Sequence, residues 1–424
     1  MEIKNIHKEF LSSNGVSTDT RKIKRNQLFF ALKGENFNGN LYADHALENG
    51  AKLAIIDEKQ SDMSNKILVK DALKTLQELA TFHREFLETP IIAITGSNGK
   101  TTTKRLIAEV LSKKFNIKAT KGNLNNHIGV PLSLLELDEN TEIGVIEMGA
   151  NHQKEIAFLS EITKPDFGYI TNFGKAHLEG FGGVQGVIKG KSELYDFLKS
   201  NKKLAFVNAD DDKQMAKLKD TKKFSFGEGK HADYNIYFKK ADPFVELEFE
   251  GIETTTKLVG AYNFRNIAAA IGIGQYFGVD VLKIKDAIQN FKAKDNRSQI
   301  KITKHNTLIS DAYNANPTSM NAALESFSNQ KADKKIAILG DMFELGKDKI
   351  IEHQQIAQTA ENLDIHKVYF CGSIFHEALS VENYSTFKKF EDLKNYLETN
   401  QIRGAHILIK GSRGMALERL YEVL

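Results

Sequence analysis

One segment constrains the fold of this chain more than any other: the apolar run IIAIT at 91–95 leads directly into GSNGKTTTK at 96–104. An amphipathic helical pattern begins at Thr101, so the glycines lie between a strand and a helix. Glycine backbones can turn with positive φ and direct several N–H groups at one anion, and the helix N-terminus adds partial positive charge. The pattern predicts a phosphate-binding loop, made of Gly96, Ser97, Asn98, Gly99, Lys100, Thr101 and Thr102.

The residues of this loop favour a nucleotide. Lys100 can reach the β- and γ-phosphates, and the Thr101 hydroxyl can hold Mg²⁺. The match is to the second half of the Walker pattern, because Ile94 stands where its first glycine would be. The alternative is a glycine turn beside a solvated lysine. Because strand and helix flank the loop correctly, we predict ATP binding, with Mg²⁺ to offset the charge of phosphoryl transfer.

The rest of the chain has a βα rhythm. Apolar runs alternate with helical patterns from residue 91 onward, which indicates a mostly parallel sheet covered on both faces. VELEFE at 245–250 alternates strictly and predicts an antiparallel strand with one solvated face. The βα rhythm returns with TLISD at 307–311, as in an open doubly wound sheet. We predict an α/β protein of three domains: a small N-terminal α/β domain at 1–88, a central phosphate-loop domain with a parallel sheet at 89–293, and a Rossmann-like domain at 294–424.

Composition excludes several other classes. The net charge of +3 has no polyelectrolyte character, so we expect no nucleic-acid partner. No stretch approaches the roughly 18 uncharged apolar residues of a membrane span, and MEIKNIHKEF at the start lacks the apolar core of a secretory signal. Cys371 is the single cysteine and lies in the apolar run VYFC, which favours a buried inert thiol over a nucleophile. We expect a cytoplasmic protein.

Three further residues are candidates for metal binding or catalysis. Glu147 ends an apolar strand in EMGAN, where its carboxylate would project at the ligand-binding edge of the sheet. On chemistry alone we favour it as a Mg²⁺ ligand over a structural carboxylate. His177 alone is better interpreted as a hydrogen-bonded loop histidine, and Lys191 alone as a solvated helix lysine.

Several spaced motifs change these interpretations. Besides TGSNGKTTT, they are GNLNNHIGVPLSLL at 122–135, EMGAN at 147–151, the segment 172–177, NADD at 208–211, YNFRN at 262–266, DAYNANP at 311–317, GDMFELG at 340–346 and KGSR at 410–413. Together they resemble the Mur ligases of peptidoglycan synthesis, and the resemblance covers essentially the whole chain. DAYNANP and GDMFELG are similar to the family member that adds D-alanyl-D-alanine.

The resemblance implies an ATP-dependent ligase that joins D-alanyl-D-alanine to UDP-N-acetylmuramoyl-tripeptide. The tripeptide carboxylate would attack the γ-phosphorus to give an acyl phosphate, which the dipeptide amine would then attack. Both partners are small molecules, and we expect a monomer. Two alternatives stay open within enzymes: a sibling ligase that adds one amino acid, or a folylpolyglutamate synthase-like enzyme. From another class, a phosphate-loop switch or motor would hydrolyse ATP without the other substrates.

The resemblance also implies roles for particular residues. It implies that Lys191 is carbamylated, which would turn a cation into a metal ligand with two anionic oxygens. Thr101 and Glu147 would then serve one Mg²⁺, and His177 with carbamylated Lys191 a second. The implied catalytic residues are Lys100, Glu147, His177, Lys191 and Arg297.

Further contacts follow from the same resemblance. The implied nucleotide contacts are Asn263 and Asn266 on the adenine side, Arg297 at the γ-phosphate, Asp311 at the ribose, and Tyr313 and Asn314 nearby. The implied substrate contacts are Ser17, Thr18, Asp19 and Arg21, in a segment similar to the family's uridine-binding DSR motif, together with Asn125 and Asn126.

Some features depart from the family or allow a plainer interpretation. Tyr262 replaces the histidine usual before the first asparagine, and FNGN at 37–40 lacks the acidic and histidine residues often found there. DAYNANP could be only a turn stabilised by Asx bonds and proline, and LGDMFELG a strand followed by a tight turn. STDTR at 17–21 could be a simple helix N-cap.

Overall fold

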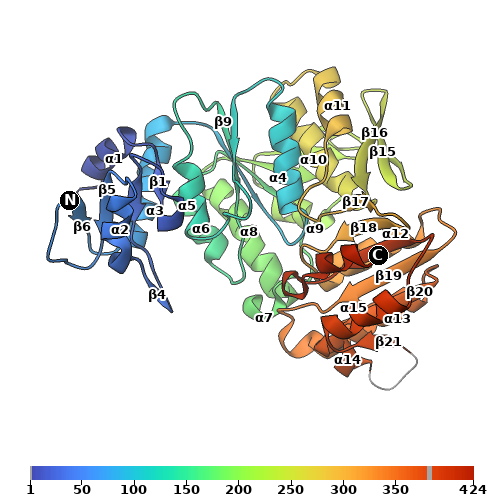
Figure 1. The fold of residues 1–424 in the computed structure, drawn as a ribbon. Coiled ribbons are helices and arrows are strands. Elements are labelled where there is room, and N and C mark those ends of the chain that lie inside the picture. The colour runs from blue at the N-terminus through green and yellow to red at the C-terminus, as the bar shows by residue number, and fades with distance from the viewer. Residues whose placement is uncertain (1, 380–383) are drawn as a thin grey trace.

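The computed structural model describes residues 2–379 and 384–424. Figure 1 shows an N-terminal sheet at one end of the molecule, a large central sheet, and a C-terminal sheet at the other end. Helices cover these sheets, so the mixed α/β class predicted from the sequence is confirmed.

The N-terminal sheet is parallel throughout, in the order β1-β2-β5-β6. Its strands are β1 (Val16–Ser17), β2 (Leu28–Phe30), β5 (Leu53–Ile56) and β6 (Lys66–Leu68), with the hairpin β3 (Lys33–Gly34) and β4 (Phe37–Asn38) beside them. Its helices are α1 (Ile3–Leu11), η1 (Thr20–Lys22), η2 (Gly39–Tyr42), α2 (Ala43–Glu48) and α3 (Ala72–Leu87). Phe30 packs in the same core as Leu76 of α3, while Phe29 packs with Ala43 on the opposite face.

The central sheet has the order β13-β12-β11-β10-β7-β9-β8, and every pairing is parallel. Its strands are β7 (Ile91–Thr95), β8 (Ile117–Ala119), β9 (Ile143–Glu147), β10 (Phe167–Ile170), β11 (Leu204–Asn208), β12 (Lys223–Gly227) and β13 (Tyr234–Asn235). Its helices are α4 (Lys100–Leu111), α5 (Gly129–Leu134), α6 (Glu155–Thr163), α7 (Leu178–Phe181), α8 (Val184–Ser200), α9 (Asp212–Lys217), α10 (Asn263–Tyr276) and α11 (Val281–Asn290). Because β7, β9 and β10 are parallel neighbours, the loops that follow them meet at one edge.

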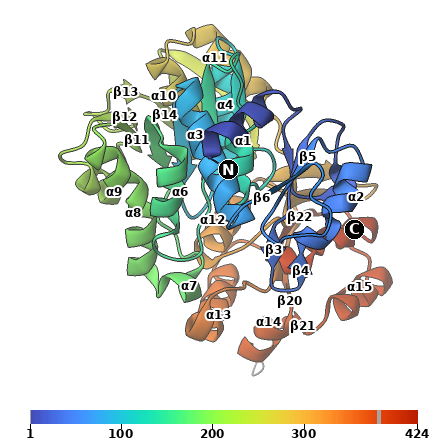
Figure 2. The same cartoon turned by 90° about the vertical axis from the view of Figure 1, so that its left-hand side faces the viewer.

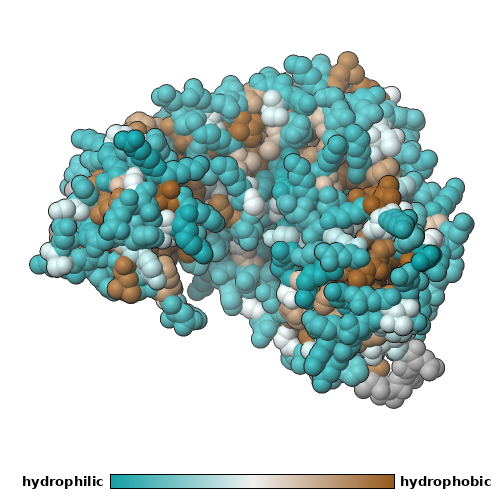
Figure 3. Space-filling model, viewed as in Figure 1, coloured by the Kyte–Doolittle hydropathy of each residue, from teal (hydrophilic) through white to brown (hydrophobic). Residues whose placement is uncertain are grey.

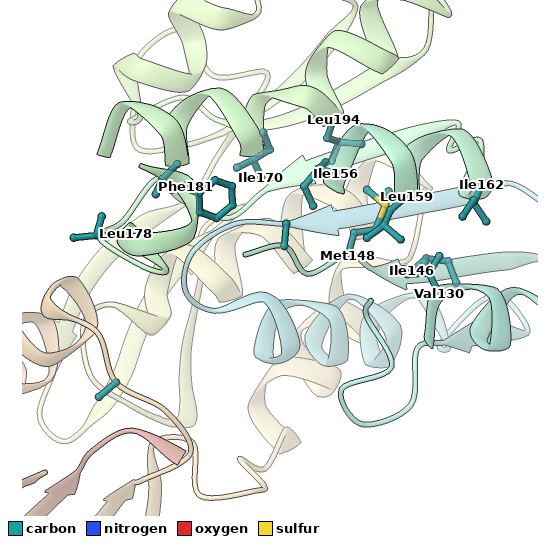
Figure 4. Packing of buried hydrophobic residues seen from close by; sticks show 14 of the residues in the cluster. Val130, Ile146, Met148, Ile156, Leu159, Ile162, Ile170, Leu178, Phe181 and Leu194 are labelled. Carbon is teal, nitrogen blue, oxygen red and sulfur yellow. The ribbon is translucent and has the colours of Figure 1, made fainter. Parts of the chain in front are cut away.

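Both faces of this sheet are buried, which explains the continuous apolar run of β7. Ile91 and Ala93 belong to one hydrophobic cluster, and Ile92 and Ile94 to another on the opposite face. Figure 4 shows the first cluster beneath α6 and α8, with Val130, Ile146, Met148, Ile156, Leu159, Ile162, Ile170, Leu178, Phe181 and Leu194 labelled.

A separate antiparallel sheet interrupts the βα rhythm. Its strands are β14 (Tyr237–Ala241), β15 (Phe244–Phe249) and β16 (Ile252–Val259). Val245, Leu247 and Phe249 are buried, while the residues between them are partly exposed. The prediction of an antiparallel strand with one solvated face is therefore confirmed.

The C-terminal sheet has the order β17-β18-β22-β19-β20-β21. Among the described strands of this sheet, only β17 and β18 pair in antiparallel fashion, and the other pairings are parallel. Its strands are β17 (Gln299–Ile302), β18 (Thr307–Asp311), β19 (Lys335–Gly340), β20 (Lys367–Cys371), β21 (Ser385–Phe387) and β22 (His406–Lys410). Its helices are α12 (Pro317–Ser328), η3 (Gly346–Asp348), α13 (Lys349–Glu361), α14 (Ser373–Ala378), α15 (Phe390–Thr399), η4 (Arg413–Met415) and η5 (Leu417–Glu422). Cys371 is buried at the end of β20, and burial raises the pKa of its thiol to about 12, as an inert thiol requires.

The N-terminal part packs against the central part and is separated from the C-terminal part. Helix α3 packs on α5 and α6, so the N-terminal part rests on the central sheet, as Figure 2 shows from that end. In Figure 3 a notch separates the N-terminal part from the C-terminal part. The predicted boundary at 88/89 falls just after α3, and the one at 293/294 falls between α11 and β17. Within the described residues, no helix combines the length and apolar character needed to cross a membrane.

Candidate active site

The phosphate loop has the local geometry that its glycines predict. Gly96 and Gly99 have φ values of +138° and +80°. A Cβ at Gly96 would lie 2.0 Å from Thr171 Oγ1, and a Cβ at Gly99 would lie 2.4 Å from Asn266 Oδ1. Both positions therefore require glycine for conformation and for space.

Lys100, the first residue of α4, folds back over this loop. Its Nζ donates to the carbonyl oxygens of Gly96 at 2.7 Å and Ser97 at 3.2 Å. Burial lowers the pKa of Lys100, while the charge of Glu147 acts in the opposite direction. The ammonium is thus already placed at the mouth of the loop, where phosphate oxygens would replace carbonyl partners.

Glu147 lies at the end of β9 and is 1% exposed. Its Oε1 accepts hydrogen bonds from Asn125 Nδ2 at 2.8 Å and Thr101 Oγ1 at 3.2 Å. Its Oε2 lies 3.0 Å from Nζ of Lys104, which is 2% exposed. Burial alone would raise the pKa of Glu147, but the positive charges of Lys104 and Lys100 and the Asn125 hydrogen bond outweigh it, so the pKa is lowered.

Sequence reasoning missed Lys104. Its position was a usable signal, because residues three and four apart on a helix share a face. Lys104 lies three residues after Thr101 on α4, on the side that faces β9. It is therefore a buried counter-ion for the carboxylate predicted to bind metal.

The oxygens at this point suit a magnesium ion. Thr101 offers a hydroxyl and Glu147 a carboxylate, and Mg²⁺ prefers such oxygens together with water and phosphate ligands. Within the described residues, no three His, Cys, Asp or Glu side chains converge into a metal-binding group. The donor set therefore fits an ion held largely by a phosphate substrate, and does not resemble a cage formed by the protein alone.

His177 and Lys191 lie at the start of α7 and on α8, the two helices that follow β10. His177 is the N-cap of α7 with φ +52°, and its Nδ1 lies against the Glu344 carboxylate. Lys191 on α8 is 1% exposed, donates to the Ala150 carbonyl at 3.0 Å, and lies 4.9 Å from the Phe181 ring centroid.

The interpretation of Lys191 as a solvated helix lysine is wrong. Burial lowers its pKa well below the ordinary value, and the nearby charge of Lys100 adds to this effect. The signal was present in the sequence, because Val187, Leu194 and Leu198 share its buried face of α8. A lysine within an apolar helical stripe should have been expected inside the protein.

The asparagines predicted for the adenine side brace the phosphate loop. Asn266 Oδ1 accepts from Thr103 Oγ1 at 3.0 Å, and its Nδ2 donates to Asn263 Oδ1 at 2.8 Å. Asn263 in turn donates to the Val259 carbonyl at 2.8 Å. Tyr262, the departure from the family pattern, hydrogen-bonds Ser298 at 2.8 Å across to the C-terminal part.

The C-terminal residues form a polar cluster opposite the loop. The guanidinium of Arg297 lies 3.5 Å from the Tyr313 ring centroid, and its Nε has no hydrogen-bond partner among the described residues. Burial lowers the pKa of Arg297. Asp311 accepts from Lys410 Nζ at 2.5 Å, and Lys410 also donates to the Asn314 carbonyl at 3.2 Å.

These elements enclose one cavity of about 950 Å³. Of the predicted residues, those that line it are Ser97, Asn98, Gly99, Lys100, Thr101, Thr102, Asn125, Asn126, Glu147, His177, Asn263, Asn266, Arg297, Asp311, Tyr313 and Asn314. Gly96 and Lys191 do not line it, although Ala150, the hydrogen-bond partner of Lys191, does. Residues more than 200 positions apart in sequence therefore meet at one nucleotide-sized space.

The predicted substrate residues of the N-terminal part lie away from this cavity. Ser17, Thr18, Asp19 and Arg21 are absent from its lining. Asp19 caps η1 through the Arg21 backbone N–H and pairs with the Arg21 guanidinium at 2.9 Å. The Arg21 hydrogen bond lowers the pKa of Asp19 to about 2. The plainer interpretation, an N-cap, describes this geometry, and a substrate role stays a prediction.

Comparisons with known proteins agree across the chain. The family models described as Mur ligase family, catalytic domain, Mur ligase middle domain, and Mur ligase, glutamate ligase domain match residues 12–84, 94–274 and 296–413. The UDP-N-acetylmuramoyl-tripeptide–D-alanyl-D-alanine ligase of Bacillus subtilis is 36% identical over 97% of this chain and 93% of its own length. The crystal structure of MurF from Acinetobacter baumannii has a TM-score of 0.87 and 29% identity, covering 98% of this chain and 97% of that one. MurF ligase from Thermotoga maritima in complex with ADP has a TM-score of 0.84 and 28% identity, with the same coverage.

Proposed function

The chain belongs to the Mur ligase family, and from this premise we propose how its residues divide the work of the reaction. It is an ATP-dependent ligase that joins D-alanyl-D-alanine to UDP-N-acetylmuramoyl-tripeptide in peptidoglycan synthesis. The observation that carries the proposal is a shared cavity, lined by the phosphate loop on one side and by Arg297, Asp311 and Tyr313 on the other.

The loop and the C-terminal cluster would hold ATP between them. Backbone N–H groups of residues 97–101 and the Lys100 ammonium would bind the phosphates, while Asp311 and Asn314, which also line the cavity, would bind the ribose. Arg297 offers an Nε that has no hydrogen-bond partner in the described part of the chain, and a guanidinium already held by stacking on Tyr313. Lys100 and Arg297 would thus stabilise the charge of the γ-phosphoryl group from opposite sides.

The reaction we propose has two steps. The terminal carboxylate of the tripeptide attacks the γ-phosphorus, and ADP leaves, giving an acyl phosphate. The amine of D-alanyl-D-alanine then attacks the acyl carbon, phosphate leaves, and the amine loses a proton. Because oxide is a poor leaving group and phosphate a good one, the first step makes the second possible. The protein mainly positions the groups and excludes water, which would hydrolyse the acyl phosphate.

We propose Mg²⁺ as the cofactor of this site, held by Thr101 and Glu147, with a second ion served by His177 and Lys191. Bound there, Mg²⁺ would offset the charge that develops during phosphoryl transfer. Asn125 and Lys104 fix the Glu147 carboxylate for this purpose through contacts at 2.8 and 3.0 Å.

We further propose that Lys191 acts as a carbamate. Its buried amine has a strongly lowered pKa, and a neutral amine is the form that adds to CO₂. It lies directly behind the cavity wall, because its partner Ala150 lines the cavity. A carbamate would also remove the repulsion between this amine and the charge of Lys100.

The remaining substrate would bind from the N-terminal side. We propose that the segment 17–21 contacts the UDP end and that Asn125 and Asn126 line the path of the peptide. We propose a cytoplasmic location, since ATP and the UDP-linked substrate are intracellular metabolites, and we propose that the working protein is a monomer. The predicted domains 1–88, 89–293 and 294–424 would then each contribute one group of contacts.

The test is a coupled assay of phosphate release with substrates added one at a time. We expect full release only when ATP, UDP-N-acetylmuramoyl-tripeptide and D-alanyl-D-alanine are all present. A nucleotide switch would hydrolyse ATP without the other two, and a sibling ligase would accept a single amino acid. Parallel assays with lysine and with diaminopimelate at the third peptide position would identify the natural tripeptide substrate.

A further inference from the structure

The C-terminal part rests on a short segment of the central part, residues 174–179, between β10 and α7. The Lys175 backbone N–H donates to Thr318 Oγ1 at 2.8 Å, and Lys175 Nζ donates to the Glu352 carboxylate at 2.6 Å. Two residues further on, His177 pairs with Glu344. The backbone N–H of Glu179 also donates to the Glu344 carbonyl at 3.3 Å. One segment therefore carries a docking contact and a predicted catalytic histidine side by side.

The two nitrogens of the His177 ring have different surroundings. Nδ1 is shielded from solvent, and apart from the Glu344 carboxylate it has no partner among the described residues. The residue itself lines the cavity. A carboxylate on one imidazole nitrogen selects the tautomer and orients the ring, which leaves the other nitrogen for a ligand.

Glu344 is held in place by the loop that carries it. The preceding backbone N–H groups are anchored: Met342 donates to His353 Nε2 at 3.0 Å, and Phe343 donates to Ser412 Oγ at 2.9 Å. Glu344 has φ +62° and the facing His177 has φ +52°. Left-handed backbone is strained for residues other than glycine, and such strain persists where the surrounding structure enforces it.

We propose that Glu344 is a positioning residue for the ligase reaction: it arrives with the C-terminal part and fixes the ring of His177. The inference rests on the proposed role of His177 at the active site. Its consequence is that the histidine is aligned only when the C-terminal part is docked. Docking of the C-terminal part on the central part would thereby bring Arg297 to the nucleotide and orient His177 at the same time.

A purely structural role would make Glu344 one more docking contact, and Glu352 provides the matched control. Glu344 lies in the loop after β19 and Glu352 lies in the first turn of α13, and both carboxylates pair with side chains of the same segment. Lys175, the partner of Glu352, does not line the cavity, whereas His177 does. Truncating each carboxylate to alanine removes one docking contact, but only Glu344→Ala releases the histidine.

The experiment measures kcat and the KM for ATP in Glu344→Ala, Glu344→Gln, Glu352→Ala, His177→Ala and the double variant His177→Ala with Glu344→Ala. We expect Glu344→Ala to lower kcat about tenfold to a hundredfold with little change in KM. Glu352→Ala removes the partner of Lys175, which does not line the cavity, and should leave kcat and KM near their wild-type values. Glu344→Gln keeps an acceptor oxygen and should lie between wild type and Glu344→Ala. In the His177→Ala background, Glu344→Ala should have no further effect.

A spectroscopic readout separates orientation from docking. Long-range ¹H–¹⁵N spectra of protein labelled with ¹⁵N-histidine, with His177 assigned through His177→Ala, should show a protonated Nδ1 in wild type and Glu352→Ala. In Glu344→Ala the tautomer should change or become mixed. Equal losses in both alanine variants, an unchanged tautomer in Glu344→Ala, or full activity of His177→Ala would each overturn the inference. Absence of ligation by wild type with all three substrates would instead overturn the proposed function.

Discussion

Replacing Lys104 by methionine tests the buried pair with Glu147, which sequence reasoning missed. Methionine has a similar length and no branching, so it can fill the same space. The two side chains are 2% and 1% exposed, and their charged atoms are 3.0 Å apart. Removing one partner leaves a buried carboxylate without its nearest counter-charge.

The expected loss is in the free energy of unfolding. Breaking a buried pair costs about 3–5 kcal/mol, and we take the lower end because Glu147 keeps hydrogen bonds from Asn125 and Thr101. At roughly 3 °C per kcal/mol for a domain of 150–250 residues, the midpoint of thermal unfolding should fall by about 10 °C. Glu147 has a lowered pKa in the folded state, so the pair stabilises above the unfolded value of 4.5. The difference between variant and wild type should therefore persist down to about pH 4.5 and shrink as the pH falls below that value, through the lowered pKa of the folded state.

Differential scanning calorimetry at pH 7.5 and pH 4 measures both effects. The control is the double variant Lys104→Met with Glu147→Gln, which removes the unpaired charge and should unfold at a higher temperature than Lys104→Met alone. If Lys104→Met unfolds at the wild-type temperature, or if the double variant is no more stable than the single one, the pair does not carry the stability assigned to it.

Three further predictions concern other sites. In Lys100→Ala, turnover should fall by on the order of 100-fold or more, because the charge acts mainly on the moving phosphoryl group. The midpoint of thermal unfolding should stay near that of wild type. Unchanged turnover would exclude the proposed loop role. Lys191→Ala should lose most activity and regain part of it with acetate or formate. The activity of wild type depleted of CO₂ should rise when bicarbonate is added. Full activity of Lys191→Ala without added acid would rule out the ligand role. His7 Nε2 lies 3.1 Å from His83 Nδ1. Burial is the larger cause and the charge of His83 the smaller cause that lower the pKa of His7 from 6.5 to about 4. The folded state thus keeps His7 neutral where the unfolded chain binds a proton, so stability should be lost as the pH falls from 6.5 toward 4, and chemical denaturation of His7→Phe should show a weaker dependence over this range.

The features that the sequence predicted correctly are those whose physics is local. Glycine conformations at 96 and 99, a helix beginning beside Lys100, and the alternation in 245–249 depend on neighbours within a few residues. Spaced motifs then identified the family, because a ligand site keeps residue types at fixed places along the chain.

What the sequence alone determined, then, is the class of fold, the family and the phosphate loop, since strand periods, glycine turns and motif spacing are written in consecutive residues. Only the tertiary structure decided which charges meet. Lys104 with Glu147 and His177 with Glu344 join residues 43 and 167 positions apart, and Lys191 lies buried on a helix face toward the core. Coulomb energy and desolvation depend on distance and burial, and neither quantity exists until the chain has folded.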